Sequence, residues 1–317
     1  MFNNMMYVYE VYREKSFSKA AAKLYISQPS LSAMVKKVEM RIGAPLFDRS
    51  TNPVKLTECG EEYIKCVEKI IDIENEFSHY VNDLHDLATG YLTIGASNFF
   101  SSYMLPPLIT RYMEKYPRVT VKLVESNTPR IGEKLTDGSL DLIMDNYEFD
   151  EKLFKKKVCY SETLLFAVRT DHVKETRAWE YALTAEDIQR DVHLAKDTAP
   201  VPLTALESLP FVLLRQGNDT RVRAEKIFSE GGISPKVLMR LDQLATAFHV
   251  AYSGIGATLV SDTLVKKIRP NEELSYFRVE GPYARRDVYF FYKRGKYVSR
   301  SMEELMNMGA ELYANKV

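Results

Sequence analysis

One segment near the start of the chain carries side chains that can bind base edges and phosphates. Over residues 27–42 the helical repeat places apolar side chains on one face. The opposite face is poor in large apolar groups and consists of Gln28, Ser30, Ser32, Ala33, Lys36, Lys37 and Arg41. A glutamine amide can form two hydrogen bonds with adenine, whereas a lysine ammonium pairs with phosphate. The pattern predicts a helix in the major groove of DNA, with Gln28 at a base edge and Lys36 and Lys37 at phosphates.

Two short helices and a tight turn would position this face. We expect Ser18 to cap a first helix that ends at Leu24, and residues 25–26 to form the turn. Ser27 then caps the second helix, whose first turn tolerates Pro29 because those N–H groups have no intrahelical partner. The core side of the second helix consists of Leu31, Met34, Val35, Val38 and Ile42. A β-wing is expected to follow.

This segment resembles the winged helix-turn-helix of LysR-type transcriptional regulators. The matching positions are Ser16-Phe17, Ala20-Ala21, Leu24, Ser27 to Ser32, Glu39, Gly43, Pro45-Leu46-Phe47, Arg49, Leu56-Thr57-Glu58 and Gly60. A match this extended is far more specific than a bare helix-turn-helix pattern. The resemblance covers nearly the whole chain and implies double-stranded promoter DNA as a partner. The DNA-binding residues that it implies are Ser27, Gln28, Pro29, Ser30, Ser32, Ala33, Lys36, Lys37 and, on the wing, Arg49.

The composition is that of an ordinary globular protein. Of 317 residues, 45% are apolar and 27% charged, and this length favours two or three domains. Neither a membrane-spanning run nor a signal-peptide pattern is present in the sequence, so we expect a cytoplasmic protein with no membrane partner. The three cysteines form no Cys-x-x-Cys pair, and the five histidines lack metal-ligand spacing. With no nucleophile elbow or phosphate loop either, we expect no catalysis, no metal and no cofactor.

The charge is balanced overall but not along the chain. Residues 1–60 carry nine Lys or Arg against five Asp or Glu, a net charge of +4, which leaves −4 for the remainder. A modest excess of this size can arise by chance on a surface. Beside the helix-turn-helix pattern, it supports phosphate attraction by the N-terminal domain.

The segment from Thr57 to Leu87 has the pattern of a long helix with an apolar seam. Thr57 is the expected cap, and the seam consists of Cys59, Tyr63, Cys66, Ile70, Ile73, Phe77, Tyr80, Leu84 and Leu87. A helix with such a seam needs a cover, since the seam would otherwise face water. Either a second copy of the chain or the chain's own globular domain could supply that cover. The resemblance favours the first, because this family dimerises through this helix, and it implies a homodimer or a dimer of dimers.

After residue 90, strands alternate with helices, which indicates an α/β fold with parallel sheets covered on both faces. The strands expected in a first half are 91–95, 119–124 and 140–144, with helices at 105–116 and 129–135. Those of a second half are 164–168, 211–214, 237–241 and 257–260, with helices at 220–230 and 243–252. After about residue 265 the chain is expected to return to the first half, with a strand at 288–292 and a helix at 299–313.

We therefore predict a winged helix-turn-helix over residues 1–58, a linker and dimerisation helix over 59–89, and an effector-binding region over 90–317. The resemblance implies that the last region is similar to periplasmic binding proteins, with two α/β lobes around a cleft. Lobe I would comprise residues 90–161 and 266–317, and lobe II residues 162–265.

The loops that follow the strands are expected to line that cleft, because ligands bind beyond the carboxyl ends of parallel strands. Hydroxyl and amide side chains gather in these loops and at adjoining helix starts, which favours a small polar or anionic effector. The candidate effector-binding residues are Ser97, Asn98, Thr128, Asn146, Gln216, Asn218, Gln243 and Thr246. Each of them could instead be only a helix cap or a turn residue.

Two further features admit alternatives. A redox sensor of the same architecture would have to use Cys159, since no other cysteine lies in the effector-binding region. A small-molecule-binding protein or an enzyme is the less favoured alternative. The connection over residues 169–209 is long, and its Trp179 could pack against the body or cover the cleft; we favour packing.

Overall fold

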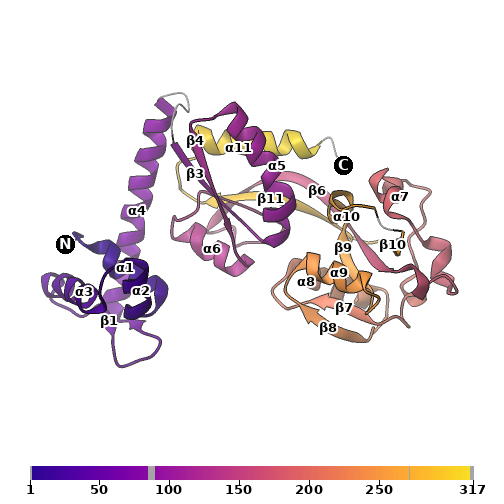
Figure 1. The fold of residues 1–317 in the computed structure, drawn as a ribbon, viewed down its shortest axis with the longest axis horizontal. Coiled ribbons are helices and arrows are strands. Elements are labelled where there is room, and N and C mark those ends of the chain that lie inside the picture. The colour runs from indigo at the N-terminus through magenta and orange to yellow at the C-terminus, as the bar shows by residue number, and fades with distance from the viewer. Residues whose placement is uncertain (1, 85–89, 271, 315–317) are drawn as a thin grey trace. The chain divides into compact units, whose positions relative to one another are not determined.

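The computed structural model describes residues 2–84, 90–270 and 272–314, and Figure 1 draws its ribbon. The chain divides into two compact units, with the boundary after Ser78. Within the described residues, each helix is either too short or too polar to cross a membrane.

The first unit is a helical domain with a two-stranded wing. Its elements are α1 (Met5–Glu14), α2 (Phe17–Lys23), α3 (Gln28–Ile42), β1 (Phe47–Asp48), β2 (Lys55–Leu56) and the first part of α4 (Glu58–Leu84). The predicted cap of α2 was wrong, because the Ser16 hydroxyl, not that of Ser18, accepts the bond from the Lys19 N–H. Ser16 has the extended backbone that a capping residue needs, whereas Ser18 is already helical.

The core of this unit includes the start of α4. Val8, Leu31, Val35 and Leu46 are fully buried, and Tyr63, Ile64 and Val67 of α4 join the same cluster. Thr57 caps α4 as predicted, since its Oγ1 accepts from the Gly60 N–H at 3.0 Å. Gly60 allows the close approach, because a Cβ there would collide with the carbonyl oxygen of Leu46.

The two ends of the predicted seam lie in different environments. The N-terminal part of α4 packs on its own domain through Tyr63, which the sequence pattern alone had left open. Farther along, Ile73, Phe77 and Tyr80 are 63%, 67% and 51% exposed, so the described core of the first unit does not extend to this face of α4. Leu87 lies outside the described residues.

The second unit begins with lobe I, whose first three strands are parallel. The strands are β3 (Gly90–Ala96), β4 (Val119–Glu125) and β5 (Leu142–Asp145), and β3 lies between the other two. The helices are the π-helical η1 (Phe100–Met104), α5 (Leu105–Lys115), α6 (Thr128–Thr136) and, from the C-terminus, α11 (Arg300–Ala314). The hydroxyls of Tyr112 and Ser301 lie 2.6 Å apart in the interior, joining α5 to α11.

Lobe II consists of shorter strands and the helices between them. Its strands are β7 (Phe211–Leu214), β8 (Val237–Leu241), β9 (Thr258–Ser261) and β10 (Leu274–Arg278), and its main helices are α8 (Asp219–Glu230), α9 (Leu244–Tyr252) and α10 (Asp262–Lys267). β7 and β8 are parallel, and a parallel bridge from Phe211 to Ala257 connects them to the chain before β9. A cluster containing Phe166, Phe211 and Phe228 fills the interior.

Two long strands, β6 (Phe154–Arg169) and β11 (Arg285–Lys293), connect the lobes and correct two predictions. β6 pairs antiparallel with β11 in lobe I and, farther along, with β9 and β10 in lobe II. The seven-stranded sheet that contains them is therefore mixed, not parallel, because β6 and β11 cross between the lobes in opposite directions. Because β10 pairs with β6 in lobe II, the chain returns to lobe I near residue 285, not at 266.

The long connection between β6 and β7 docks on lobe II. It contains η2 (Thr170–His172), η3 (Arg177–Tyr181), α7 (Ala185–Gln189), η4 (Val192–Leu194) and η5 (Leu203–Ala205). The ring of His193, 1% exposed, lies 3.0 Å from a carboxylate oxygen of Asp262 and anchors the connection to α10. The packing expected of Trp179 is only partial, because this side chain is 44% exposed.

Candidate DNA interface and effector cavity

The start of α3 has the geometry that the sequence predicted. The Ser27 hydroxyl accepts from the Ser30 N–H at 3.3 Å, and Gln28 and Pro29 form the first turn. Gln28, Ala33, Lys36 and Lys37 are exposed along one face, opposite buried Leu31, Val35 and Val38. The exposed face therefore offers an amide and two ammonium groups to a partner.

Local hydrogen bonds occupy the two serines of this face. The Ser27 hydroxyl donates to that of Ser30 at 3.0 Å, and the Ser32 hydroxyl accepts from Arg49 Nη1 at 3.3 Å. These bonds tie Ser30 to the start of α3 and Ser32 to the wing, beside the exposed amide of Gln28.

Arg49 is held in place by side chains of α2 and α3. Its Nη2 lies 2.9 Å from Glu39 Oε2, and its guanidinium lies 5.0 Å from the ring centroid of Phe17. Glu39 also accepts from the Leu46 N–H at 2.9 Å, so one carboxylate fixes both the start of the wing and its arginine. With a side chain 42% exposed, Arg49 keeps part of its guanidinium available to a phosphate or a groove.

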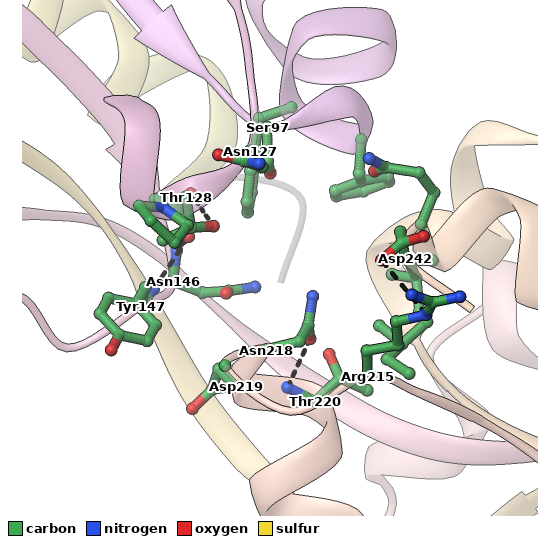
Figure 2. Close-up of a pocket in the computed structure, with 18 of the residues that line it drawn as sticks. Ser97, Asn127, Thr128, Asn146, Tyr147, Arg215, Asn218, Asp219, Thr220 and Asp242 are labelled. Atoms are coloured by element: carbon green, nitrogen blue, oxygen red, sulfur yellow. Dashed lines mark hydrogen bonds and ion pairs between the residues drawn. The ribbon is translucent and has the colours of Figure 1, made fainter. Parts of the chain in front are cut away.

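A cavity of about 290 Å³ lies between the lobes of the second unit. Figure 2 shows Ser97, Asn127 and Thr128 on the side of lobe I and Arg215, Asn218 and Asp242 on the side of lobe II. The side chains of Asn146 and Asn218 extend toward the space between these walls. Phe99, Phe100 and Tyr147 add an aromatic portion to the lining.

Most of the predicted effector-binding residues meet in this cavity. Ser97, Thr128, Asn146, Gln216, Asn218 and Gln243 line it. Asn98 does not, because its amide donates to Glu125 Oε1 at 3.0 Å at the end of β4. Thr246 is exposed on α9 and does not line the cavity either, because the helix turns it away from the first residues, Gln243 and Leu244.

Three helices begin at the cavity wall. Asn127 caps α6 by accepting from the Arg130 N–H, and Asn218 caps α8 by accepting from the Thr220 N–H. Gln243 precedes α9 without a side-chain cap hydrogen bond. The first turn of α9 therefore keeps backbone N–H groups that a ligand acceptor could use.

Sequence reasoning missed Arg286, a buried arginine on β11 that lines the cavity. Its Nε lies 2.7 Å from Glu162 Oε1, and its Nη1 lies 2.7 Å from Asp219 Oδ2 and 2.8 Å from Thr220 Oγ1. With its amide oxygen facing the guanidinium, Asn146 accepts from Nη2 at 2.9 Å. The available signal was strand alternation, since Arg286 shares the inward face with Val288 and Phe290.

The charges of the lining are largely paired. Arg286 is balanced by Glu162 and Asp219, Asp219 is also held by Arg223 at 2.8 Å, and Arg215 faces Asp242 at 3.6 Å. Among the residues that the structure describes, Asp145 has no ion pair at hydrogen-bond distance, and it accepts from the N–H groups of Asn146 and Tyr147. Burial raises the pKa of Asp145 to about 6, against the lowering effect of these backbone bonds.

Family models match both parts of the chain. A bacterial regulatory helix-turn-helix protein model of the lysR family matches residues 2–61, and a LysR substrate binding domain model matches residues 85–313. The chain belongs to the LysR family of transcriptional regulators. This LysR-type regulator therefore combines a DNA-binding helix-turn-helix with an effector-binding α/β region.

Individual relatives agree with that assignment. The regulator is 27% identical over 308 residues to the uncharacterized HTH-type transcriptional regulator YcgK of Bacillus subtilis, covering 97% of this chain and 93% of the relative. It is 32% identical over 257 residues to a probable RuBisCO transcriptional regulator of Synechocystis sp., covering 80% of this chain and 69% of the relative.

Solved structures share the fold of this LysR-type regulator. Full-length CbnR complexed with its target DNA has a TM-score of 0.60 at 16% identity, covering 100% of both chains. A variant of full-length OxyR from Pseudomonas aeruginosa has a TM-score of 0.61 at 21% identity, covering 97% of this chain and 96% of that one.

The cysteines of the regulator differ in exposure. Cys66 is exposed on α4 and Cys59 is partly buried, whereas Cys159 on β6 is 4% exposed. Burial raises the pKa of the Cys159 thiol to about 12, so little thiolate forms at neutral pH. Across the described residues, no group of His, Cys, Asp and Glu side chains is arranged to hold a metal ion.

Proposed function

We propose that the exposed face of α3 and the wing bind promoter DNA as the sequence predicted. Gln28 contacts a base edge, Lys36 and Lys37 contact phosphates, and Arg49 contacts the adjacent minor groove or backbone. Around them, Ser27, Pro29, Ser30, Ser32 and Ala33 form the surface that approaches the duplex. The exposure of Gln28 and both lysines on one helix face supports this assignment.

We further propose that the cavity between the lobes holds the effector that controls this DNA binding. The observation that carries the proposal is the convergence of predicted polar residues from both lobes: Ser97, Thr128, Asn146, Gln216, Asn218 and Gln243. Because the charged groups of the wall are largely paired with one another, the wall favours a small polar molecule rich in hydrogen-bond donors and acceptors.

In this proposal the effector acts by a population shift. β6 and β11 both cross between the lobes, so their crossing near Glu162 and Arg286 is the natural hinge. A ligand that bonds Thr128 on one side and Asn218 on the other favours the arrangement in which both reach it. It can shift the equilibrium only by its difference in affinity for the two arrangements.

The regulator would act as a homodimer or as a dimer of dimers. The exposed Ile73, Phe77 and Tyr80 on α4 support this, because a second α4 would remove them from water. Residues 1–58 would then serve DNA binding, 59–89 assembly and 90–317 effector control. A thiol switch at Cys159 is the less favoured mode of control, since that thiol is buried and holds its proton.

A thermal-shift screen of small polar metabolites tests the effector site. Thr128→Val removes a hydroxyl with little change in volume, and Thr246→Val is the matched control on an exposed position outside the cavity. A cavity ligand should raise the Tm of the wild type and of Thr246→Val alike by mass action. For Thr128→Val its affinity should fall by roughly fivefold to thirtyfold, as expected for one lost hydrogen bond. A ligand that stabilises Thr128→Val as much as the wild type binds elsewhere.

A further inference from the structure

A second recess lies on lobe II beside the effector cavity, and arginines line most of it. Its lining consists of Arg215, Gln216, Arg221 and Arg240. Arg215 and Gln216 also line the effector cavity, so the loop between β7 and α8 separates the two spaces. The proposed function makes no use of Arg221 or Arg240.

The fold brings these arginines together from three elements. β7 and β8 are parallel and in register with Leu213 opposite Arg240, and the Arg215 N–H donates to the carbonyl of Leu241 at 2.8 Å. Arg221 belongs to the first turn of α8, which follows the loop after β7. The recess therefore lies at the carboxyl ends of two parallel strands, where α/β folds bind ligands.

The charge of the recess is only partly neutralised. Arg221 pairs with Glu225 at 2.6 Å, and Arg215 lies 3.6 Å from Asp242 with both side chains mostly exposed. Arg240 is exposed and makes no ion pair with the residues that the structure describes. Three guanidinium groups thus face two carboxylates at the margin, which leaves a net positive charge.

Arg221 supplies an independent observation, a buried hydrogen-bond donor that is not satisfied. Its side chain is 10% exposed, and its Nη1 is buried with no hydrogen-bond partner among the described residues. A buried donor without an acceptor destabilises the fold, and a guanidinium donor more so than a neutral one. An oxyanion in the recess would supply acceptors to this side chain once it turns toward the ligand.

We propose that this recess binds a phosphoryl group. Guanidinium groups match the oxygens of phosphate with paired hydrogen bonds, and a dianion suits a site that three arginines line. The phosphoryl group could belong to free inorganic phosphate or to the end of an effector whose body lies in the adjoining cavity. The second source rests on the proposed function of that cavity, whereas the first does not.

Titration calorimetry with inorganic phosphate, at constant ionic strength set by sodium chloride, tests the site in the full chain. Arg240→Gln removes an exposed guanidinium without disturbing the core. The control is Arg190→Gln, which removes an exposed guanidinium at the end of α7, outside the recess. Phosphate should bind the wild type and Arg190→Gln alike, and Arg240→Gln at least about tenfold more weakly. No phosphate binding to the wild type, or equal binding to all three proteins, overturns the proposal.

A second titration with glycerol phosphate separates the two sources. If a bound phosphoester extends into the cavity, Thr128→Val should weaken its binding but leave that of inorganic phosphate unchanged. If the recess binds phosphate alone, Thr128→Val should affect neither ligand, and Arg240→Gln should weaken both. Weakening of inorganic phosphate by Thr128→Val and not by Arg240→Gln would place the anion in the cavity and refute the recess. Failure of the proposed function would instead appear in the metabolite screen.

Discussion

At the scale of single residues, the same pairing recurs at both candidate sites, with different consequences. Arg49 is held by Glu39 at 2.9 Å on the wing, and Arg286 is held by Glu162 at 2.7 Å beside the cavity. The first pair is partly exposed, so it contributes little to stability and serves to orient the guanidinium. The second is 1% and 0% exposed, so each partner depends on the other for its burial.

The different roles proposed for Gln28 and Lys37 on α3 give a prediction for single side chains. Gln28→Ala should reduce the preference for the cognate site over random DNA, because it removes an amide that can pair with adenine. Lys37→Ala should weaken binding to every duplex and lower the slope of log K against log salt by about one. Binding titrations on cognate and random duplexes at several salt concentrations measure both effects.

Lys69→Ala, on an exposed position of α4, is the control for the lost charge. It should leave the salt slope unchanged. If Gln28→Ala weakens cognate and random DNA by the same factor, the amide does not read a base.

Which residues form the cavity was predictable in part. Ser97, Thr128 and Asn218 follow strands or begin helices, and sequence patterns locate such positions well. Asn98 and Thr246 are near neighbours of cavity residues in the sequence, but the backbone directs their side chains away from the cavity. The direction of a single side chain in a loop or a first helical turn could not be predicted from the sequence. Arg286 was missed because strand alternation places it inward only once the strand is known to start at Arg285.

At the scale of elements, long periodic segments were the predictable ones. The strand at 164–168 was expected, yet β6 begins ten residues earlier, at Phe154. Its early residues include Lys155, Lys156 and Lys157, which are exposed, so the apolar signal was absent there. Local sequence patterns also could not predict that β10 belongs to lobe II. That placement depends on pairing with β6, a strand about a hundred residues away.

The exposed part of α4 gives a prediction at this scale. Phe77→Asp would place a charge in the apolar face that a second α4 is proposed to cover, at a cost of several kcal/mol of association free energy. The variant should be largely monomeric by light scattering at concentrations where the wild type is a dimer or larger. Its DNA affinity should fall as well, since two half-sites are no longer bound by one assembly.

Ser78→Asp is the matched control, because it adds the same charge to an exposed polar position of α4. It should keep the wild-type oligomer. If Phe77→Asp keeps the wild-type oligomeric state, this face of α4 does not form the dimer interface.

At the scale of the whole molecule, the two lobes share one buried ionic network. Glu162 and Arg286 are cross-strand partners in the register of β6 and β11, near the point where both strands pass between lobes. From there Arg286 reaches Asp219 and Thr220 of lobe II and Asn146 of lobe I. A ligand that moves either wall of the cavity therefore acts on groups that Arg286 holds.

Arg286→Met should lower the stability of the effector-binding region strongly, because it leaves Glu162 buried without its counter-charge. The expected loss is about 3–5 kcal/mol, or a Tm lower by about 6–20 °C. Asp219 keeps its ion pair with Arg223 at 2.8 Å, so the loss of stability should come mainly from the unpaired charge of Glu162. The double variant Arg286→Met with Glu162→Gln removes the orphaned charge and should recover a substantial part of the loss, as thermal unfolding monitored by circular dichroism would record. If the single variant loses less than about 2 °C, or if Glu162→Gln restores none of the loss, the buried pair does not hold the lobes as inferred.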